Sequence, residues 1–238
     1  MLQATDLNRK IAGKDILKRI SLSVAPGEIA CVIGPSGAGK TSLLRAISLL
    51  DRPDSGAIVI GNTEYCFPSE RKMLTAPYPN LTIVFQQLFI WPHLTIRENI
   101  TLPLKGDVDT RHFEEVVASF QMKEFLDRYP NEVSVGQKQR AALARALLLK
   151  PTYLLLDEVT SALDIEQAHL ILSHLKEIAA KGVAIVLATH ALHFAGKISN
   201  KVIFLDEGEV VESGSSEILT KPKTERLRKF IGAAEQVV

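Results

Sequence analysis

The sequence has few cysteines, few aromatic residues and no long apolar runs. Of its 238 residues two are cysteine, one is tryptophan and 6% are aromatic. Cys31 and Cys66 lack metal-ligand spacing, and the first residues do not form a basic-then-apolar signal segment. No apolar stretch approaches the roughly 18 residues that span a bilayer. We therefore expect a protein of the reducing cytosol, and other chains must supply any path across a membrane.

The sequence also lacks an excess of charge of either sign. Lys and Arg number 28 against 27 Asp and Glu, which gives a formal net charge of +1. No strong overall field therefore directs the chain to nucleic acid or to an anionic membrane surface, and any partner must be recognised locally. With 46% hydrophobic residues, the chain can bury a sizeable core as a single domain over 1–238.

Short apolar runs alternate with turn signals and helical patterns. Fully apolar strands separated by helices indicate a buried parallel sheet with crossover helices. The helical pattern over 112–149, divided at Pro130, predicts a helical insert at about 88–150. Residues 62–80, rich in Pro, charge and turn formers, are expected to be irregular and exposed. Strands are predicted at 16–24, 29–33, 57–60, 153–156 and 183–188, and helices at 41–47 and 167–180.

A glycine-rich loop stands between a predicted strand and a predicted helix. Residues 34–41 match the pattern G-x-x-x-x-G-K-[ST]. The glycines let backbone N–H groups converge on phosphate oxygens at a helix N-terminus, Lys40 reaches the β- and γ-phosphates, and Thr41 offers its hydroxyl to Mg²⁺. The alternative, a glycine-rich turn without a ligand, is disfavoured by this context. The residues assigned to ATP here are Gly34, Pro35, Ser36, Gly37, Ala38, Gly39, Lys40, Thr41 and Ser42.

Two adjacent carboxylates follow another apolar strand. Asp157 and Glu158 come directly after residues 153–156, which read Tyr-Leu-Leu-Leu. In this position Asp157 can hold Mg²⁺, and Glu158 can polarise the water that attacks the γ-phosphate, a role worth about 10²–10⁴-fold in rate. An acidic pair after a strand is as often the start of a solvated loop. The phosphate loop in the same chain favours the catalytic interpretation.

Further motifs resemble the markers of the ABC transporter ATPases. Residues 133–137 read Val-Ser-Val-Gly-Gln and are similar to the L-S-G-G-Q signature at the start of its helix. Gln86, with Gln87 as the alternative, resembles the Q-loop glutamine. Residues 161–164 (Ser-Ala-Leu-Asp) are similar to the D-loop, and His190 resembles the switch histidine. Together these motifs span nearly the whole chain in the order of the family.

The resemblance implies a fold and a division of labour. The fold is an α/β P-loop NTPase of ABC ATPase type, with a RecA-like parallel-sheet core, an N-terminal antiparallel β-subdomain and a helical subdomain. In this family two ATP molecules are sandwiched between two chains, so an ATP-dependent homodimer is implied. Asp164 would cross the interface. The implied catalytic residues are Glu158, His190 and Gln86. The implied Mg²⁺ ligands are Thr41, Gln86 and Asp157. The residues implied to contact the ATP of the partner chain are Ser134, Val135, Gly136 and Gln137.

The sequence departs from the family pattern at several positions. Val135 replaces the first signature glycine; a β-branched residue does not readily adopt positive φ and adds bulk where backbone approaches a phosphate. We therefore expect weak ATP-driven dimerisation. Ile11 falls near the position where many members place an aromatic ring against adenine, so apolar contact replaces stacking. Val159 and Ile165 stand where prolines are frequent, which touches no phosphate ligand.

The chain resembles the polar amino-acid uptake branch of the family around the Q-loop, at residues 85–87 and 91–100, and near its end, at residues 211–214 and 221–231. The branch implies integral membrane permease subunits, an external solute-binding protein and a peripheral location on the cytoplasmic face of the inner or plasma membrane. Leu88, Phe89, Ile90 and Trp91 form an apolar cluster that fits a groove for a helix of the membrane subunit. The alternative for this cluster is core packing within the insert.

The motifs leave three functions open. The first is the ATPase subunit of an importer for amino acids. The second is a non-transport ABC ATPase that acts as a nucleotide-gated clamp on ribosome or DNA. The single cassette and the absence of heptads and basic tracts count against it, so no nucleic-acid partner is expected. The third is a nucleotide-binding module with little turnover, motivated by Val135 and opposed by the intact Lys40, Asp157, Glu158 and His190.

Overall fold

The N-terminal part of the chain forms an antiparallel sheet. The computed structural model describes residues 1–69, 74–104, 106, 108–160 and 165–235. Strand β1 (Leu2–Ile11) pairs with β2 (Lys14–Val24) and with β4 (Ser55–Ile60), and β5 (Thr63–Phe67) extends the sheet in the order β2-β1-β4-β5. Every pairing in it is antiparallel. The predicted antiparallel β-subdomain is therefore confirmed.

Strand β5 corrects one expectation, since residues 62–80 are not irregular throughout. Tyr65 and Phe67 are buried, while Glu64 and Cys66 between and before them are exposed. This alternation is the period of a half-buried strand. It spans only five residues beside charge and proline, so its pattern was too short to stand out in the sequence.

A second sheet contains the predicted parallel core. Its order is β10-β9-β3-β8-β7-β6, where all neighbouring strands are parallel except the pair of β9 and β10. The predicted strands at 29–33, 153–156 and 183–188 are confirmed within a residue. The sequence analysis did not predict β6, β9 or β10. The strands are β3 (Ile29–Ile33), β6 (Leu81–Val84), β7 (Tyr153–Asp157), β8 (Ala184–Ala188), β9 (Lys201–Asp206) and β10 (Glu209–Gly214).

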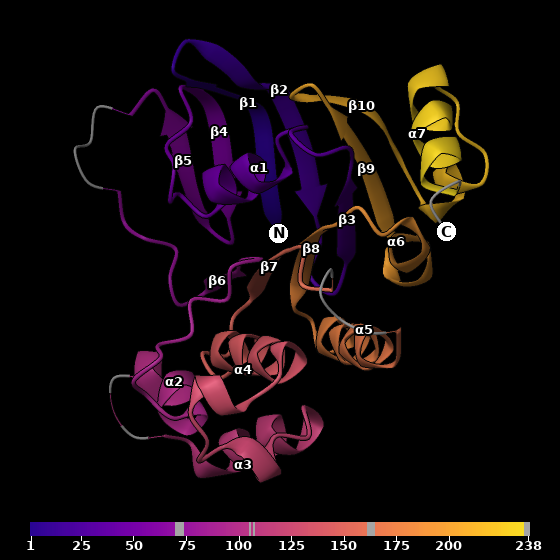
Figure 1. Ribbon diagram of the computed structural model, residues 1–238. Coiled ribbons are helices and arrows are strands. Elements are labelled where there is room, and N and C mark those ends of the chain that lie inside the picture. The colour runs from indigo at the N-terminus through magenta and orange to yellow at the C-terminus, as the bar shows by residue number, and fades with distance from the viewer. Residues whose placement is uncertain (70–73, 105, 107, 161–164, 236–238) are drawn as a thin grey trace.

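Helix α1 (Lys40–Ile47) lies between the two sheets (Figure 1). Its buried residues Leu43, Leu44 and Ile47 join one hydrophobic cluster with the inner faces of both sheets. A helix that is apolar on several sides must be buried on several sides. The mixed sheet packs against one side of α1 and the antiparallel sheet packs against another. The layers are thus antiparallel sheet, α1 and mixed sheet, followed by helices on the far face.

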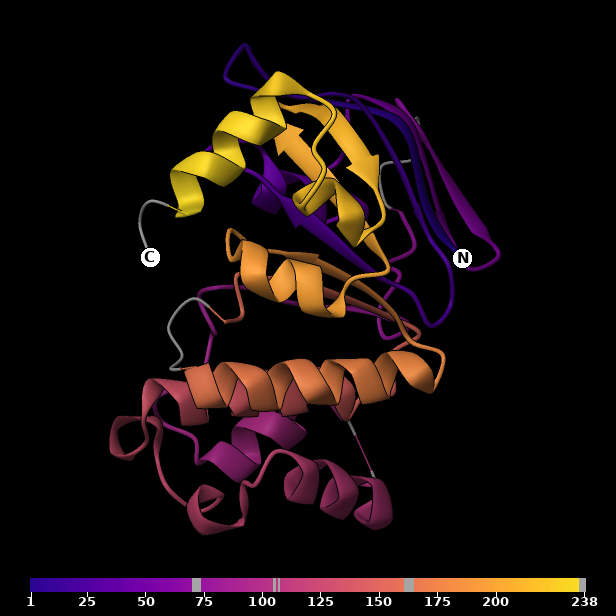
Figure 2. The ribbon, with the colours of Figure 1, turned by 90° about the vertical axis from the view of Figure 1, so that its right-hand side faces the viewer.

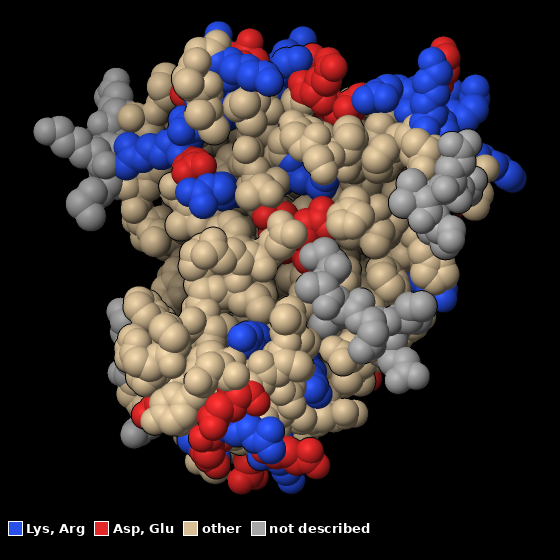
Figure 3. All heavy atoms as spheres, in the orientation of Figure 1, with Lys and Arg blue, Asp and Glu red and all other residues tan. Residues whose placement is uncertain are grey.

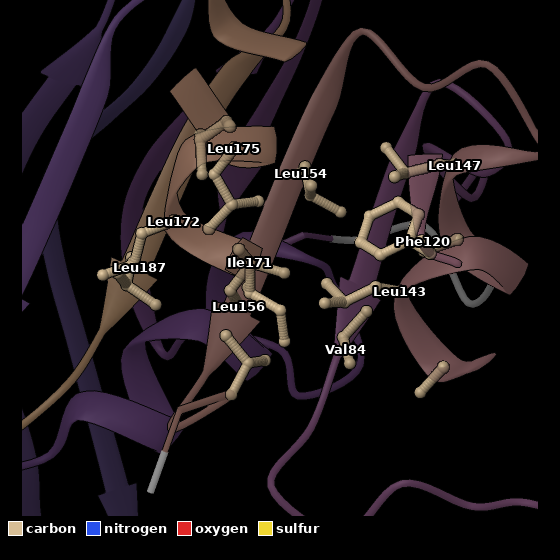
Figure 4. Packing of buried hydrophobic residues seen from close by; sticks show 14 of the residues in the cluster. Val84, Phe120, Leu143, Leu147, Leu154, Leu156, Ile171, Leu172, Leu175 and Leu187 are labelled. Atoms are coloured by element: carbon tan, nitrogen blue, oxygen red, sulfur yellow. The ribbon is translucent and has the colours of Figure 1, made fainter. Parts of the chain in front are cut away.

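The far face of the mixed sheet is covered by helices, and α5 runs lengthwise beneath it in Figure 2. Figure 4 shows Leu143 and Leu147 from one helix, and Ile171, Leu172 and Leu175 from another, gathered around strand residues of a second hydrophobic cluster. None of the helices in the described ranges is long and apolar enough to cross a membrane. The helices on the far face of the sheet are α4 (Val135–Leu147), α5 (Ile165–Ala180), α6 (Leu192–Ile198) and, beside β10, α7 (Glu225–Glu235).

The segment between β6 and β7 is mostly helical, as predicted. It contains α2 (Ile96–Thr101), α3 (Thr110–Ser119) and α4, which lie together below the sheet in Figure 1. Where the segment is described, it also contains short 3-10 helices at Leu102–Leu104, Lys123–Phe125 and Pro130–Glu132. The helical pattern predicted over 112–149 is thus broken well before Pro130, because α3 ends at Ser119.

The strand order brings distant loops to one edge. Val32 of β3 and Asp157 of β7 both pair with Ala188 of β8, so the carboxyl ends of these three strands lie level. The carboxyl ends of β6 and β9 reach the same edge, because both strands are parallel to their neighbours. In open α/β sheets this edge is where ligands bind.

Candidate active site

The glycine-rich loop leaves β3 at the centre of this edge and leads into α1. Gly34 and Gly39 both have positive φ, of 155° and 106°. A Cβ on Gly34 would lie 2.0 Å from the carbonyl oxygen of Leu205, and one on Gly39 would lie 2.9 Å from that of Ile16. Glycine is therefore required at both positions for close approach to backbone, which leaves Ser36 and Gly37 as the exposed crest of the loop.

Lys40 is folded back over the loop that precedes it. Its Nζ donates to the carbonyl oxygens of Gly34 at 2.7 Å and Pro35 at 3.1 Å, and it lies 3.9 Å from Oε1 of Glu158. Burial lowers the pKa of Lys40, and the carboxylates of Glu158 and Asp157 act against that shift. The loop thus encloses the positive charge of the Lys40 ammonium, which can bind a phosphate seated in the loop.

Asp157 ends β7 and is buried. Burial raises its pKa, and a hydrogen bond from the Thr41 hydroxyl acts in the opposite direction. Among the described residues nothing hydrogen-bonds to Oδ1 of Asp157, although this atom is inaccessible to solvent. A buried carboxylate oxygen without a partner, beside a threonine hydroxyl, fits the hard oxygen ligands that Mg²⁺ takes together with substrate phosphates.

Glu158 is held in a left-handed backbone conformation with φ of 52°. Its N–H donates to the carbonyl of Ala188 at 2.9 Å and so continues the ladder of β7 and β8 by one residue. Oε2 lies 2.8 Å from Nδ1 of His190, whose side chain is 62% exposed. The carboxylate therefore stands between the Lys40 ammonium and the His190 ring, at the mouth of the site.

The remaining candidates near this edge are more exposed. Gln86 follows β6, the strand next to β7, and its side chain is exposed, as is that of Gln87. Ile11 ends β1 in the hairpin with β2 and is 45% exposed. Ser42, in the first turn of α1, is partly buried. Gln86 thus shares the edge with Asp157, whereas Ile11 belongs to the other sheet.

The signature residues lie at the start of α4, in the helical insert. Ser134 caps the helix: its Oγ accepts from the N–H of Gln137 at 3.2 Å, and its own N–H donates to Oε1 of Gln137 at 2.8 Å. In the part of the chain that the structure describes, residues 134–137 make no hydrogen bond to the phosphate loop. The geometry does not bring the two motifs of one chain together.

The expectation that Val135 stands where the backbone needs a positive φ is wrong. Val135 is the first residue of α4, outside the residues with positive φ, so its β-branch causes no strain there. Its side chain is 52% exposed, and only its bulk remains as an obstacle to a phosphate. The D-loop residue Asp164 lies outside the described residues.

Sequence reasoning missed the backbone that shapes the phosphate loop from behind. The N–H of Gly208 donates to the carbonyl of Ala38 at 3.0 Å, and the N–H of Lys18 donates to the carbonyl of Gly208 at 2.8 Å. Gly208 has φ of 80°, and a Cβ on it would lie 2.5 Å from the carbonyl oxygen of Ile16. The Glu207-Gly208 pair between two apolar runs is a turn signal that the sequence analysis did not use, and it does not indicate that the turn lies beside the phosphate loop. Figure 3 shows Asp and Glu side chains in a recess near the middle of the molecule, apart from the charged residues at the top and bottom of the view.

Comparison with known proteins settles the family. The sequence profile described as "ABC transporter" matches residues 17–161, more than half of the chain. The chain belongs to the ABC transporter family. It is 36% identical to the arginine transport ATP-binding protein ArtM of Bacillus subtilis, over 97% of this chain and 98% of that protein. It is 35% identical to the glutamine transport ATP-binding protein GlnQ of Escherichia coli, over the same shares of the two chains.

Solved structures agree with this assignment. The dimeric structure of a bacterial ABC transporter cassette superposes with a TM-score of 0.81 at 30% identity, covering 91% of this chain and 99% of that one. A nucleotide-free ATP-binding cassette from an ABC transporter, at 20% identity, gives a TM-score of 0.83 and shows the shared fold. The ABC ATPase fold and the ATP-hydrolysing transporter subunit predicted from the sequence are therefore confirmed.

Proposed function

We propose that this ABC ATPase hydrolyses MgATP at Glu158 and drives amino-acid import through separate membrane subunits. Lys40 and the phosphate loop bind the triphosphate. Asp157, Thr41 and Gln86 would hold Mg²⁺, which would supply polarisation of the phosphoryl oxygens. Glu158 accepts a proton from the attacking water, and His190 keeps the carboxylate oriented.

The observation that carries this proposal is the arrangement around Glu158. One carboxylate oxygen faces the ammonium of Lys40 at 3.9 Å and the other faces Nδ1 of His190 at 2.8 Å. A γ-phosphate bound by Lys40 would therefore lie beside a carboxylate that is already aligned. A positioned base of this kind needs no rearrangement when the water attacks.

We propose that the working form is an ATP-dependent dimer with two composite sites. In one chain the signature residues 134–137 make no hydrogen bond to the phosphate loop, as far as the described residues extend. The N-terminus of α4 is a place where backbone N–H groups bind an anion, and a second copy can supply that anion. A neighbouring solved cassette is dimeric, which supports the same arrangement.

The relatives support amino acids as the solute class. ArtM and GlnQ are named for arginine and glutamine transport, and a further relative at 34% identity, TcyN of Escherichia coli, is named for L-cystine transport. We propose that permease subunits and an external solute-binding protein complete the system, and that this chain binds at the cytoplasmic face of the membrane. The helical insert, proposed here as 88–150, meets the permease.

The test is uptake by the reconstituted transporter. The chain is co-purified with its membrane subunits, placed in proteoliposomes and supplied with ATP and each of the labelled amino acids. We expect uptake with wild-type protein and none with Glu158→Gln. Hydrolysis that no membrane protein stimulates, together with co-purification of ribosomes or DNA, would favour the nucleotide-gated clamp, which the transport names of the relatives do not favour.

A further inference from the structure

The segment Leu88–Trp91 follows Gln86 and carries the apolar cluster singled out in the sequence. Phe89 is 57% exposed and Trp91 is 51% exposed, so core packing does not account for these two rings. Phe89 also has φ of 48°, a left-handed conformation that a bulky residue adopts only when its surroundings impose it. The contacts that impose it come from two helices of the insert.

The first contact is the side chain of Arg145, near the end of α4. Its Nη2 donates to the carbonyl of Leu88 at 2.7 Å and its Nη1 to the carbonyl of Phe89 at 2.8 Å. The planar guanidinium presents two parallel N–H groups, which match two neighbouring carbonyls only when the peptide between them is turned toward α4. The positive φ of Phe89 provides that turn.

The second contact is the side chain of Asn99, which is fully buried on α2. It accepts from the N–H of Trp91 at 2.7 Å and donates to the carbonyl of the same residue at 3.0 Å. Both ends of the segment are therefore fastened to the helical insert, and the fastening begins just after Gln86 and Gln87. These two glutamines join the segment to β6 of the sheet.

Arg145 also borders a cavity beside β6. The cavity has a volume of about 490 Å³ and is lined by Ala142, Arg145 and Ala146 of α4, by residues 81–83 of β6 and by residues 48–50 and 74–78. Arg145 is eleven residues beyond Ser134, or about 16 Å along a rigid helix. A shift of the signature end of α4 therefore carries the Arg145 guanidinium with it.

We propose that Arg145 is a positioning residue that makes the segment Leu88–Trp91 follow α4, with the hinge at Gln86 and Gln87. This rests on the proposed function, because the shift of α4 comes from nucleotide bound by a second copy. Binding at the signature then changes both where the exposed rings of Phe89 and Trp91 lie and where Gln86 points. Without the guanidinium fork, Leu88 and Phe89 are released from α4, and Asn99 alone fastens the segment to the insert.

The chain offers a matched control five residues earlier. Arg140 is also on α4 and also donates to two consecutive carbonyls, those of Phe120 at 3.0 Å and Gln121 at 3.4 Å. Both of its partners lie within the helical insert, beyond α3. Both bonds come from Nη1, and Arg140→Lys therefore removes a guanidinium that bonds to two carbonyls from the same helix without touching the segment.

Trp91 is the only tryptophan in the sequence, so its fluorescence reports on the segment alone. In the Glu158→Gln background MgATP is added without turnover, and the emission is compared for the parent, Arg145→Lys and Arg140→Lys chains. We expect an ATP-dependent change in the parent and in Arg140→Lys, and a smaller one in Arg145→Lys, where Asn99 alone fastens the segment. No change in the parent, or equal changes in all three, would overturn the proposal.

A second measurement uses the chains with Glu158 intact and the membrane subunits present. Arg145→Lys should lower the stimulated kcat about tenfold while the KM for ATP stays the same, and Arg140→Lys should lower neither. Equal losses in both variants, in parallel with their melting temperatures, would mean a merely structural role and reject the proposal. Failure of the wild type to respond to membrane subunits would reject the transport function, while the fluorescence comparison still decides the role of Arg145.

Discussion

Nδ1 of His190 lies 2.8 Å from Oε2 of Glu158, although the two residues follow different strands of the sheet. The exposed fractions differ, at 62% for the histidine side chain and 12% for the glutamate. The imidazole thus covers a carboxylate that also faces Lys40. This pair connects the solvent side of the site to the residue proposed as the general base.

Glu158→Gln should keep nucleotide binding and lower the rate of hydrolysis by about 10²–10⁴-fold, because an amide cannot accept the proton of the attacking water. ATP that is bound and not hydrolysed should hold two copies together. Phosphate release and light scattering with MgATP measure the two effects. Glu207→Gln is the control, since Glu207 also follows an aspartate at a strand end with positive φ; loss of hydrolysis there would contradict the assignment.

Lys40→Ala should abolish nucleotide binding or turnover. The ammonium already bonds to two loop carbonyls, so its removal takes away both the charge for the phosphates and a support of the loop. Calorimetric titration with MgATP measures the binding. Lys10→Ala, in an exposed ion pair with Asp15, should bind like the wild type. Unchanged heat in Lys40→Ala would show that the triphosphate lies elsewhere.

Asp157→Asn should stabilise the chain without nucleotide at neutral pH while impairing hydrolysis. Burial raises the pKa of Asp157 in the folded chain above its ordinary value of 3.8. The carboxyl's contribution to stability is therefore full below that value and is lost as pH rises through the folded-state pKa. Thermal unfolding should show a higher Tm for the Asn variant at pH 7 and a smaller difference near pH 4.

The control substitution is Asp206→Asn, which should change the Tm in the opposite direction. Asp206 also ends an apolar strand and is buried, but its Oδ2 accepts from Nε of Arg226. Asp206→Asn should lower the Tm at pH 7, because Arg226 loses its charged partner. Stabilisation by both substitutions, or by neither, would contradict the assignment of Asp157 as a carboxylate without a protein partner for Oδ1.

Val135→Ala should strengthen ATP-dependent dimerisation in the Glu158→Gln background. Alanine removes the exposed bulk at the first residue of α4 and favours the helix, whereas glycine removes the bulk and weakens the helix. Sedimentation with MgATP measures the dimer for Val135→Ala, Val135→Gly and the control Val108→Ala. If alanine and glycine both leave the dimer unchanged, steric exclusion by Val135 is wrong.

Much of this protein could be predicted from short stretches of its sequence. The strand, loop and helix around Lys40 follow from an apolar run, glycines and a helical period within twenty residues, and the structure has them almost at the expected bounds. The capping of α4 by Ser134 and Gln137 is equally local, because both hydrogen bonds close within one turn. The roles proposed for the site residues remain predictions.

Other features could not be read from local pattern. Strand β5 was hidden because five alternating residues beside proline and charge resemble a loop. Val135 was expected to require positive φ by comparison with a glycine, yet it begins an ordinary helix. The pairing of Arg145 with Leu88 and Phe89 joins residues more than fifty positions apart, and nothing in either segment indicates the other.

The two acidic pairs separate what sequence and tertiary structure each decided. Asp157-Glu158 and Asp206-Glu207 both stand at the end of an apolar strand, and from the sequence by itself this was predicted for Asp157-Glu158 alone. Only the order of strands in the sheet placed Glu158 beside Lys40, and only the packing of α7 placed Arg226 against Asp206. The reason is physical: backbone propensity and burial period act over a few residues, whereas strand order depends on packing between segments more than a hundred residues apart.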